Sequence, residues 1–165
     1  MYQQLTLNLA RNSLRYIIRT YGIKRLYIPY YLCNVIRLSV IKENCKPIFY
    51  HIDDNFMPVV EFPKDEYILY PNYFGICDNN VKILAKKYPK LIVDNAHSFY
   101  SEPMGFACFN SARKFLPVYN GSILWIKDAN LTFEYENQIN MPPKTELEKI
   151  KIENELNNSD IKLVK

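Results

Sequence analysis

Apolar residues recur every three or four positions in three segments of the chain, which is the spacing of one face of a helix. The first segment is followed by Gly22, which can end a helix, and Asn12 or Ser13 can cap its beginning. The third segment begins at Asp78 and is followed by Pro89, a residue type that ends helices. The spacing therefore predicts helices over residues 14–21, 34–42 and 78–88.

Between and after these segments lie short runs rich in aromatic and β-branched residues. Such runs predict strands over residues 25–29, 47–52, 67–70, 91–93, 106–109 and 122–126. Continuously apolar strands that alternate with helices are typical of a parallel sheet covered on both faces. We therefore expect an α/β fold of three layers, α/β/α, with a mostly parallel sheet. The last two strands follow each other without a helix, and the pattern leaves their pairing open.

The chain changes character near its end. A break at Met141-Pro142-Pro143 separates an α/β domain, residues 1–140, from a charged tail, residues 141–165. In the tail, Thr145 and Glu148 have the spacing of a capping box, so a charged helix is expected to follow. The full length of 165 residues is enough for one domain with a substantial core.

Composition argues against several classes of partner. The net charge of +4 comes from scattered basic residues and does not indicate nucleic-acid binding. No apolar run reaches about 18 residues, so no membrane span is expected. The first residues lack the features of a signal peptide, which makes the cytoplasm the expected location. The cysteines at positions 33, 45, 77 and 108 form no CxxC pair, so no metal site is expected.

The candidate chemistry lies where the predicted strands end. With four glycines, the chain has neither the dinucleotide motif GxGxxG nor the phosphate loop GxxxxGK. In open α/β sheets, ligands bind beyond the carboxyl ends of the strands. The beginning of the first helix, near Asn12 and Ser13, offers backbone N–H groups to an anion. Polar and aromatic residues follow four of the strands: Tyr30, Tyr31, Asn72, Tyr73, Asp94, His97, Ser111, Arg113 and Lys114.

A Lys and an Asp at neighbouring strand ends suit one cofactor, pyridoxal 5'-phosphate (PLP). A Lys holds this cofactor as a Schiff base, and a carboxylate pairs with its ring nitrogen. Lys114 and Asp94 are the candidates. Taken singly, each has a plainer interpretation. Lys114 and Arg113 could be a solvated basic pair, Asp94 a helix cap, and His97 and Tyr31 ordinary packing residues.

Four blocks of sequence carry a more specific signal. They are Ala10-Arg11-Asn12-Ser13-Leu14-Arg15-Tyr16, Pro29-Tyr30-Tyr31-Leu32-Cys33, Val93-Asp94-Asn95-Ala96-His97-Ser98, and Cys108 to Val118 with Asn120-Gly121-Ser122. Their order and spacing resemble the DegT/DnrJ/EryC1/StrS aminotransferase family over about residues 8–127. The third block resembles the family's pyridinium-binding Asp, and the fourth resembles its Schiff-base lysine motif. Family members are longer and continue into a C-terminal small domain, so the chain resembles their large domain alone.

This resemblance implies a role for each matching residue. Lys114 would form the Schiff base and move the proton, and Asp94 would pair with the ring nitrogen. His97 would lie near the phenolic oxygen of the ring, and Tyr31 would contact the ring face. The phosphate would be held by Ser111 and by the backbone at Asn12 and Ser13.

The implied function is that of a PLP-dependent aminotransferase. It would move an amino group from an amino-acid donor to a keto group of a nucleotide-linked sugar, and family active sites imply a homodimer. Two alternatives stay open. The first is a short, non-catalytic family member that serves as a cofactor-binding or partner subunit. The second is an unrelated α/β module that binds a nucleotide or an anion, which the missing phosphate-loop motif disfavours.

Overall fold

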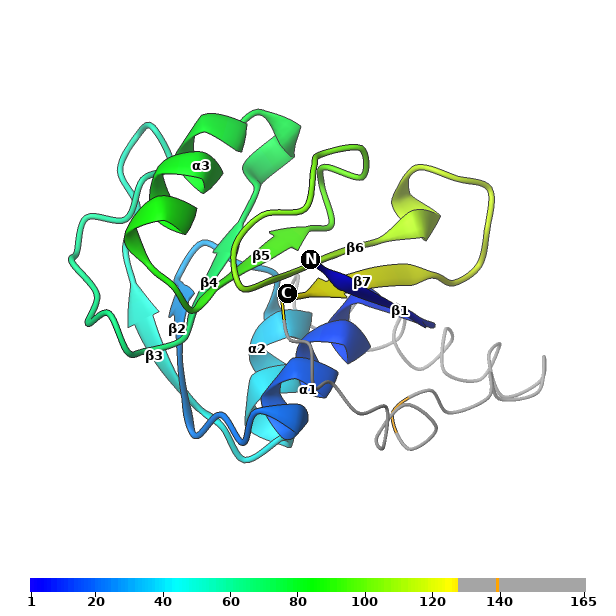
Figure 1. The fold of residues 1–165 in the computed structure, drawn as a ribbon, viewed down its shortest axis with the longest axis horizontal. Helices are drawn as coiled ribbons and strands as arrows, with labels where there is room; N and C mark the ends of the chain where they lie inside the picture. The colour runs from blue at the N-terminus through cyan, green and yellow to red at the C-terminus, as the bar shows by residue number, and fades with distance from the viewer. Residues whose placement is uncertain (128–138, 140–165) are drawn as a thin grey trace, which may run out of the picture.

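The structure is a computed structural model that describes residues 1–127 and residue 139. Within these residues, seven strands form one sheet with the order β1-β7-β6-β5-β4-β2-β3 (Figure 1). The five strands from β6 to β3 are parallel to one another, whereas β7 and β1 pair antiparallel with their neighbours. The strands are β1 Gln3–Leu7, β2 Arg25–Pro29, β3 Lys46–Tyr50, β4 Ile68–Pro71, β5 Leu91–Asn95, β6 Ala107–Asn110 and β7 Ser122–Ile126.

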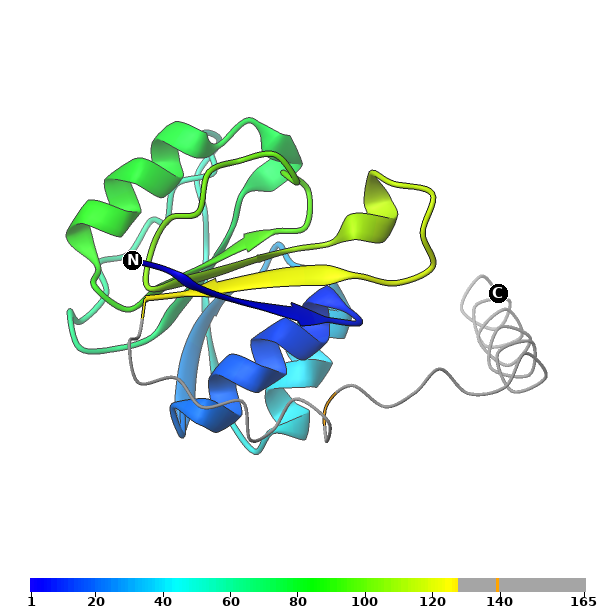
Figure 2. The same ribbon diagram turned by 45° about the vertical axis from the view of Figure 1, so that its right-hand side comes forward.

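Helices cover both faces of the sheet. Helices α1 (Ala10–Thr20) and α2 (Asn34–Lys42) lie against one face, and α3 (Asp78–Lys87) lies against the other (Figures 1 and 2). Two short 3₁₀ turns, η1 (Tyr73–Gly75) and η2 (Ala112–Lys114), follow β4 and β6. The predicted three-layer α/β/α fold with a mostly parallel sheet is confirmed.

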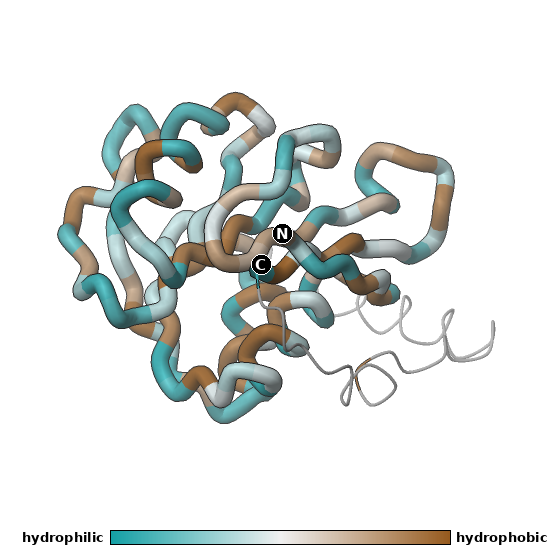
Figure 3. The backbone as a smooth tube through the Cα atoms, viewed as in Figure 1, coloured by the Kyte–Doolittle hydropathy of each residue, from teal (hydrophilic) through white to brown (hydrophobic). Residues whose placement is uncertain are grey.

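Each face of the sheet has its own apolar core. One core packs Leu14 and Ile17 of α1 and Val40 of α2 against the sheet. The other packs Val81 and Leu84 of α3 against the opposite face. Figure 3 shows hydrophobic positions along the strands and polar positions along many of the outer loops. Each fully buried Leu, Ile or Val contributes roughly 1.5–3 kcal/mol to folding, so these faces hold the layers together.

The predicted elements lie within two residues of the observed ones, with two exceptions. Helix α1 begins at Ala10 rather than after Asn12 or Ser13, and its N-cap residue is Leu9, which makes no side-chain cap hydrogen bond. Strand β1 was not predicted, because only Leu5 and Leu7 alternate there as buried positions. The pairing left open by the sequence is antiparallel between β6 and β7. The predicted helix in the charged tail, and the boundary at residue 140, lie outside the described residues.

The strand register brings the carboxyl ends of the parallel strands to one edge of the sheet. Pro71 of β4 lies beside Asp94 of β5, and Asn95 of β5 lies beside Asn110 of β6. Side chains that follow these strands are therefore neighbours in space. In the described part of the chain, no helix is long and apolar enough to cross a membrane.

Candidate functional site

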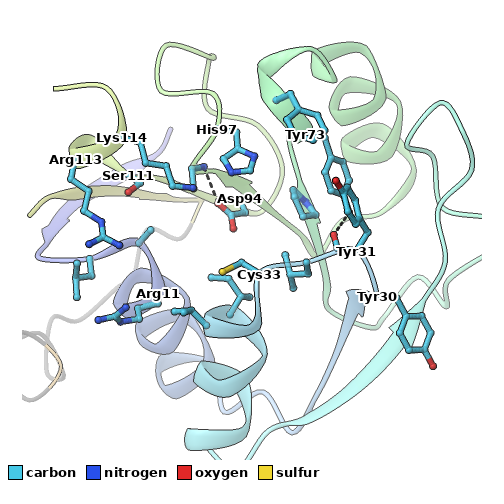
Figure 4. A pocket seen from close by; sticks show the side chains of 18 residues that line it. Arg11, Tyr30, Tyr31, Cys33, Tyr73, Asp94, His97, Ser111, Arg113 and Lys114 are labelled. Carbon is cyan, nitrogen blue, oxygen red and sulfur yellow. Dashed lines mark hydrogen bonds between the residues drawn. The ribbon is translucent and has the colours of Figure 1, made fainter. Parts of the chain in front are cut away.

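A cavity of about 450 Å³ opens at the carboxyl ends of β2, β4, β5 and β6 (Figure 4). This volume is in the range of small-molecule and cofactor sites, roughly 300–1,000 Å³. The start of α1 and the loops after β2, β4, β5 and β6 all contribute to its wall. Five of the predicted site residues line it together: Tyr31, Asp94, His97, Ser111 and Lys114.

Asp94 is the buried acid of the cavity. It lies near the carboxyl end of β5, with 6% of its surface exposed. The backbone N–H of Ala96 donates to its Oδ1 at 2.8 Å. Burial raises the pKa of this carboxyl group to about 6, although the bond from Ala96 and the charge of Lys114 oppose the shift. A positively charged ligand atom beside Asp94 would favour the ionised form.

His97 and Phe74 present their rings on the wall beside Asp94. The two rings stack with centroids 5.9 Å apart. Burial lowers the pKa of His97, and the nearby charge of Lys114 lowers it further, which favours the neutral imidazole. Phe74 has a left-handed backbone with φ 54°, so the turn η1 is bent to expose its ring. The stacked pair lines the cavity and offers uncharged ring surface to an aromatic ligand.

A polar network behind this wall holds the loops that carry the two rings. Asn72 donates through Nδ2 to Oδ1 of Asp78 at 2.7 Å, and its own Oδ1 accepts the backbone N–H of Cys77 at 3.1 Å. Ser101 donates to the same Asp78 oxygen at 2.8 Å and is hydrogen-bonded to Ser98. The network ties the loop after β4 to the loop after β5, which fixes Phe74 and His97 relative to each other.

Lys114 ends the turn η2, on the opposite side of the cavity. Its side chain extends toward Asp94 and His97 in Figure 4, and its charge influences the pKa of both groups. Ser111 precedes the turn in a buried position, whereas Lys114 itself is exposed. The amine is therefore accessible from solvent, while the carboxyl group that faces it is enclosed.

The two remaining predicted residues, Asn12 and Ser13, do not line the cavity in the described structure. Their backbone N–H groups both donate to the carbonyl of Leu9, at 2.9 and 3.2 Å. The Asn12 side chain donates to Asn8 at 2.6 Å, and the Ser13 hydroxyl is 2.7 Å from that of Ser122. Because α1 begins earlier than predicted, both residues lie in its first turn and attach the helix to its surroundings.

Other residues of the cavity wall were not assigned a role from the sequence. Arg11 enters from the start of α1 and Arg113, already expected at this edge, enters from η2, so both add positive charge to the cavity. Phe74 also lines the cavity, and it was not singled out from the sequence. Tyr31 stacks on Tyr73 with ring centroids 5.7 Å apart, and the Tyr73 hydroxyl donates to the Tyr31 carbonyl at 3.0 Å.

No family model and no curated protein matches this sequence. Solved structures with a similar fold include a DegT/DnrJ/EryC1/StrS aminotransferase from Brucella abortus, with a TM-score of 0.61 and 17% identity, over 77% of this chain and 42% of that one. A candidate sugar aminotransferase from Streptococcus pneumoniae, in its PLP form, matches with a TM-score of 0.61 and 14% identity, over 82% and 44% of the two chains. DesI, in the presence of its TDP-sugar product, matches with a TM-score of 0.58 and 16% identity, over 77% of this chain and 38% of that one.

The chain shares the fold of the matched part of these aminotransferases. It spans less than half the length of these solved neighbours, and at these identities the match concerns the fold. The expected resemblance to DegT/DnrJ/EryC1/StrS aminotransferases is therefore confirmed for the fold.

The residues that line the cavity fit PLP in their chemistry. Asp94 supplies a buried carboxyl group for the ring nitrogen, and Lys114 supplies an accessible amine. Phe74 and His97 supply a stacked aromatic surface. Among the described residues, no group of three or more His, Cys, Asp or Glu side chains could hold a metal ion.

Proposed function

We propose that this protein binds PLP and is an aminotransferase, which moves an amino group from an amino-acid donor to a keto group of a nucleotide-linked sugar. The observation that carries the proposal is the placement of Asp94 and Lys114. They come from adjacent strand ends and line one cavity, and the charge of Lys114 acts to lower the pKa of Asp94. A buried carboxyl group opposite an accessible amine is the arrangement that PLP chemistry needs.

PLP supplies an aldehyde that reacts with amines and a ring that accepts electrons. In this proposal, Lys114 would hold the cofactor through Nζ. Once a donor amine had displaced it, the free Lys114 amine would be the base that moves the proton of the donor's α-carbon. Lys114 is exposed, so its side chain has room to move between these positions.

Asp94 holds the ring nitrogen in its protonated state. Burial raises the pKa of its carboxyl group to about 6, and a cationic ring nitrogen beside it would lower that pKa and favour the ionised form. His97, which favours the neutral form, can donate a hydrogen bond to the phenolic oxygen without adding charge. Phe74 and Tyr31 exclude water from the ring faces. These roles require no residue outside the cavity wall.

The substrate part of the proposal rests on analogy. Neighbours with this fold include DesI, solved in the presence of its TDP-sugar product, and the Streptococcus pneumoniae protein described as a candidate sugar aminotransferase. A homodimer belongs to the same proposal, because Lys114 lines the cavity and is exposed, so a second copy could cover it.

The proposal is tested by titrating the purified protein with PLP and recording the visible spectrum. We expect a visible absorbance band of the kind that PLP gives when a lysine holds it as a Schiff base, and borohydride reduction should fix that link covalently. Peptide mapping should place the label on Lys114. Lys114→Ala should lose the band, whereas Lys82→Ala, a matched change of an exposed lysine on α3, should keep it.

A second stage separates catalysis from binding. Amino-acid donors are added to the PLP-loaded protein, and loss of the band with formation of a keto acid reports the first half of the reaction. PLP bound at Lys114 without turnover of any donor would favour the non-catalytic, cofactor-binding alternative. A folded protein that forms no band, or that labels other lysines equally well, would overturn the proposal.

A further inference from the structure

A ring that lies outside the cavity wall contacts two rings that belong to it. Phe56 lies in the loop between β3 and β4 and does not line the cavity. Its ring stacks on Tyr73 with centroids 5.1 Å apart, and it meets Phe74 edge-on with centroids 5.8 Å apart. Tyr73 and Phe74 both line the cavity and are consecutive residues of η1. One half-buried side chain therefore packs against both aromatic residues of this turn.

The ring contacts continue from η1 to two other loops of the cavity wall. Tyr73 stacks on Tyr31 with centroids 5.7 Å apart and donates its hydroxyl to the Tyr31 carbonyl at 3.0 Å (Figure 4). Phe74 stacks on His97 with centroids 5.9 Å apart. Tyr31 follows β2 and His97 follows β5, so the two pairs belong to loops of different strands. Phe56 contacts one ring of each pair and joins them into a single aromatic cluster.

The backbone at Phe56 is held in a conformation that costs energy. Phe56 has φ 62° and Phe74 has φ 54°, which is the left-handed region that bulky side chains rarely adopt. Hydrogen bonds fix the chain on both sides: Asp53 Oδ1 accepts the N–H of Met57 at 2.8 Å, and the Tyr70 hydroxyl donates to the Phe56 carbonyl at 2.9 Å. Strained residues persist where their surroundings fix them, and they gather at functional sites. Two strained aromatic residues in contact, one of them in the cavity wall, point to a role in shaping that wall.

We propose that Phe56 is a positioning residue, which acts through Tyr73 and Phe74 to fix the aromatic wall against which the ligand ring binds. The identity of that ligand as PLP rests on the proposed function. Without the Phe56 ring, Tyr73 and Phe74 lose a shared contact and become free to move. A ligand that needs both rings in place then has to order them when it binds, and this lowers its affinity although every group that touches the ligand is still present.

The first test is a spectroscopic titration with PLP of wild type, Phe56→Leu and Phe62→Leu. Phe62 lies in the same loop and is buried, but its ring packs against Tyr27, Tyr50 and Tyr88. Both variants lose an aromatic ring on the same face of the sheet, so both should unfold at a lower urea concentration than wild type. Phe56→Leu should also weaken PLP binding by the folded protein, roughly threefold to tenfold, which is the range expected for one aromatic pair. Phe62→Leu should leave the PLP affinity unchanged.

Three further variants show which property of Phe56 matters. Phe56→Tyr keeps the ring and should keep the wild-type affinity for PLP. Phe56→Gly removes the ring and relieves the strain of the left-handed backbone, so it should weaken PLP binding although the strain is gone. Tyr70→Phe removes the hydroxyl that donates to the Phe56 carbonyl, and it should weaken binding less than Phe56→Leu does. Because Tyr70→Phe keeps every ring, it tests the positioning role even if Phe56→Leu does not fold.

A second readout uses the protein without PLP. Burial lowers the pKa of His97, and the charge of Lys114 lowers it further. If Phe56 holds Phe74 against His97, then Phe56→Leu should expose the imidazole to solvent and raise its pKa toward the ordinary value, as measured by an NMR titration. Phe62→Leu should leave the His97 titration as it is in wild type, because its ring is not in contact with η1.

The outcomes separate the positioning role from the proposed function. If PLP labels Lys114 and the two leucine variants bind PLP equally well, at the wild-type affinity or below it, the positioning role is overturned and the proposed function stands. If wild type forms no PLP band, the proposed function fails and the His97 titration decides alone. A shift in Phe56→Leu that Phe62→Leu lacks would then support the positioning role, and equal titrations in both variants would overturn it.

Discussion

The end of β5 and the turn after β6 lie next to each other at one edge of the sheet, but they differ in burial and in how firmly hydrogen bonds hold them. Asp94 is buried at the end of β5, and the Asn72 network fixes the loops around it. Arg113 and Lys114 are exposed on η2, a single 3₁₀ turn whose cap makes no side-chain hydrogen bond. In the proposed reaction the group at β5 holds the ring still, while the amine on η2 has to move.

This difference means that substitutions on the two sides should separate stability from ligand binding. Changes behind the buried wall should lower the free energy of unfolding first and affect the ligand through it. Changes on the exposed turn should alter ligand binding while the folded state loses little. Substitutions on the two sides test whether stability and ligand binding separate in this way. The substitution at Gly75 is expected to change the free energy of unfolding most.

Gly75→Ala should destabilise the loops after β4 and β5 more than any other substitution considered. Gly75 has φ +73°, and an added Cβ would lie 2.9 Å from the backbone carbonyl oxygen of His97, which cannot easily move. We expect the free energy of unfolding, measured by urea denaturation, to fall by roughly 2–4 kcal/mol. Gly22→Ala is the control, because Gly22 has φ +56° but nothing within 4 Å of the added Cβ. Equal losses in both variants would show that the contact with His97 carries no cost.

Asp94→Asn should reveal the cost of the buried charge. In the folded protein the pKa of Asp94 is raised from 3.8 to about 6, so the protonated form is favoured. The stability that comes from this raised pKa is fully present below pH 3.8, and it is lost as the pH rises through about 6 and the buried carboxyl group ionises. We therefore expect Asp94→Asn, unfolded without PLP, to be more stable than wild type above about pH 6, by at most roughly 3 kcal/mol in the free energy of unfolding. Near about pH 3.5 the variant should show no gain over wild type.

The same substitution should weaken PLP binding, because the neutral amide cannot pair with a charged ring nitrogen. The opposite signs of the two effects distinguish a ligand-binding acid from a structural one. A structural role would lower stability at every pH and leave the PLP affinity of the remaining folded protein unchanged.

Much of this arrangement could be predicted because the relevant residues follow strong local patterns. The apolar strands before Asp94 and Ser111 are short, continuous and well bounded, so their carboxyl ends could be located from sequence. Parallel strands then place the residues at their carboxyl ends along one edge of the sheet. The five predicted residues that line the cavity all lie at such strand ends or shortly after them.

The predictions were less accurate where tertiary contacts decide the local structure. Helix α1 begins at Ala10 although Asn12 and Ser13 are better capping residues, because the hydroxyl of Ser13 bonds to Ser122 of β7 instead. The meeting of the start of α1 with η2, which brings Arg11 and Arg113 to one cavity, depends on the hydrogen bonds of Gly121 to Asn8 and Ala112. No pattern within one segment reports such a contact.

Asn72→Ala should have an intermediate effect on the buried wall. It removes the bonds from Asn72 to Asp78 and from the Cys77 N–H, and leaves that N–H without its side-chain acceptor. We expect a loss of about 1–2 kcal/mol in thermal or urea unfolding and a several-fold weaker affinity for PLP. Asn79→Ala, on the exposed face of α3, should change neither quantity. A stability loss with unchanged PLP affinity would show that the network does not position Phe74 and His97.

Gly121→Ala should have the smallest effect on stability and a larger effect on binding. Gly121 has φ +132°, and an added Cβ would lie 3.0 Å from Cβ of Ala112, a side-chain atom at the edge of the exposed turn. The turn can yield, so we expect a loss of about 1 kcal/mol. Because that movement shifts Arg113 and Lys114, PLP affinity should fall about tenfold, by loss of well-placed charged hydrogen bonds.

The double variant Gly121→Ala with Ala112→Gly shows whether the contact itself is responsible. Ala112→Gly removes the atom that the new Cβ meets, so it should restore most of the PLP affinity while the backbone strain at position 121 remains. Recovery of binding without recovery of stability would show that the turn positions the ligand-binding groups independently of the core. If the double variant binds PLP no better than Gly121→Ala alone, then the left-handed backbone at position 121, rather than the space beside Ala112, sets the position of Lys114.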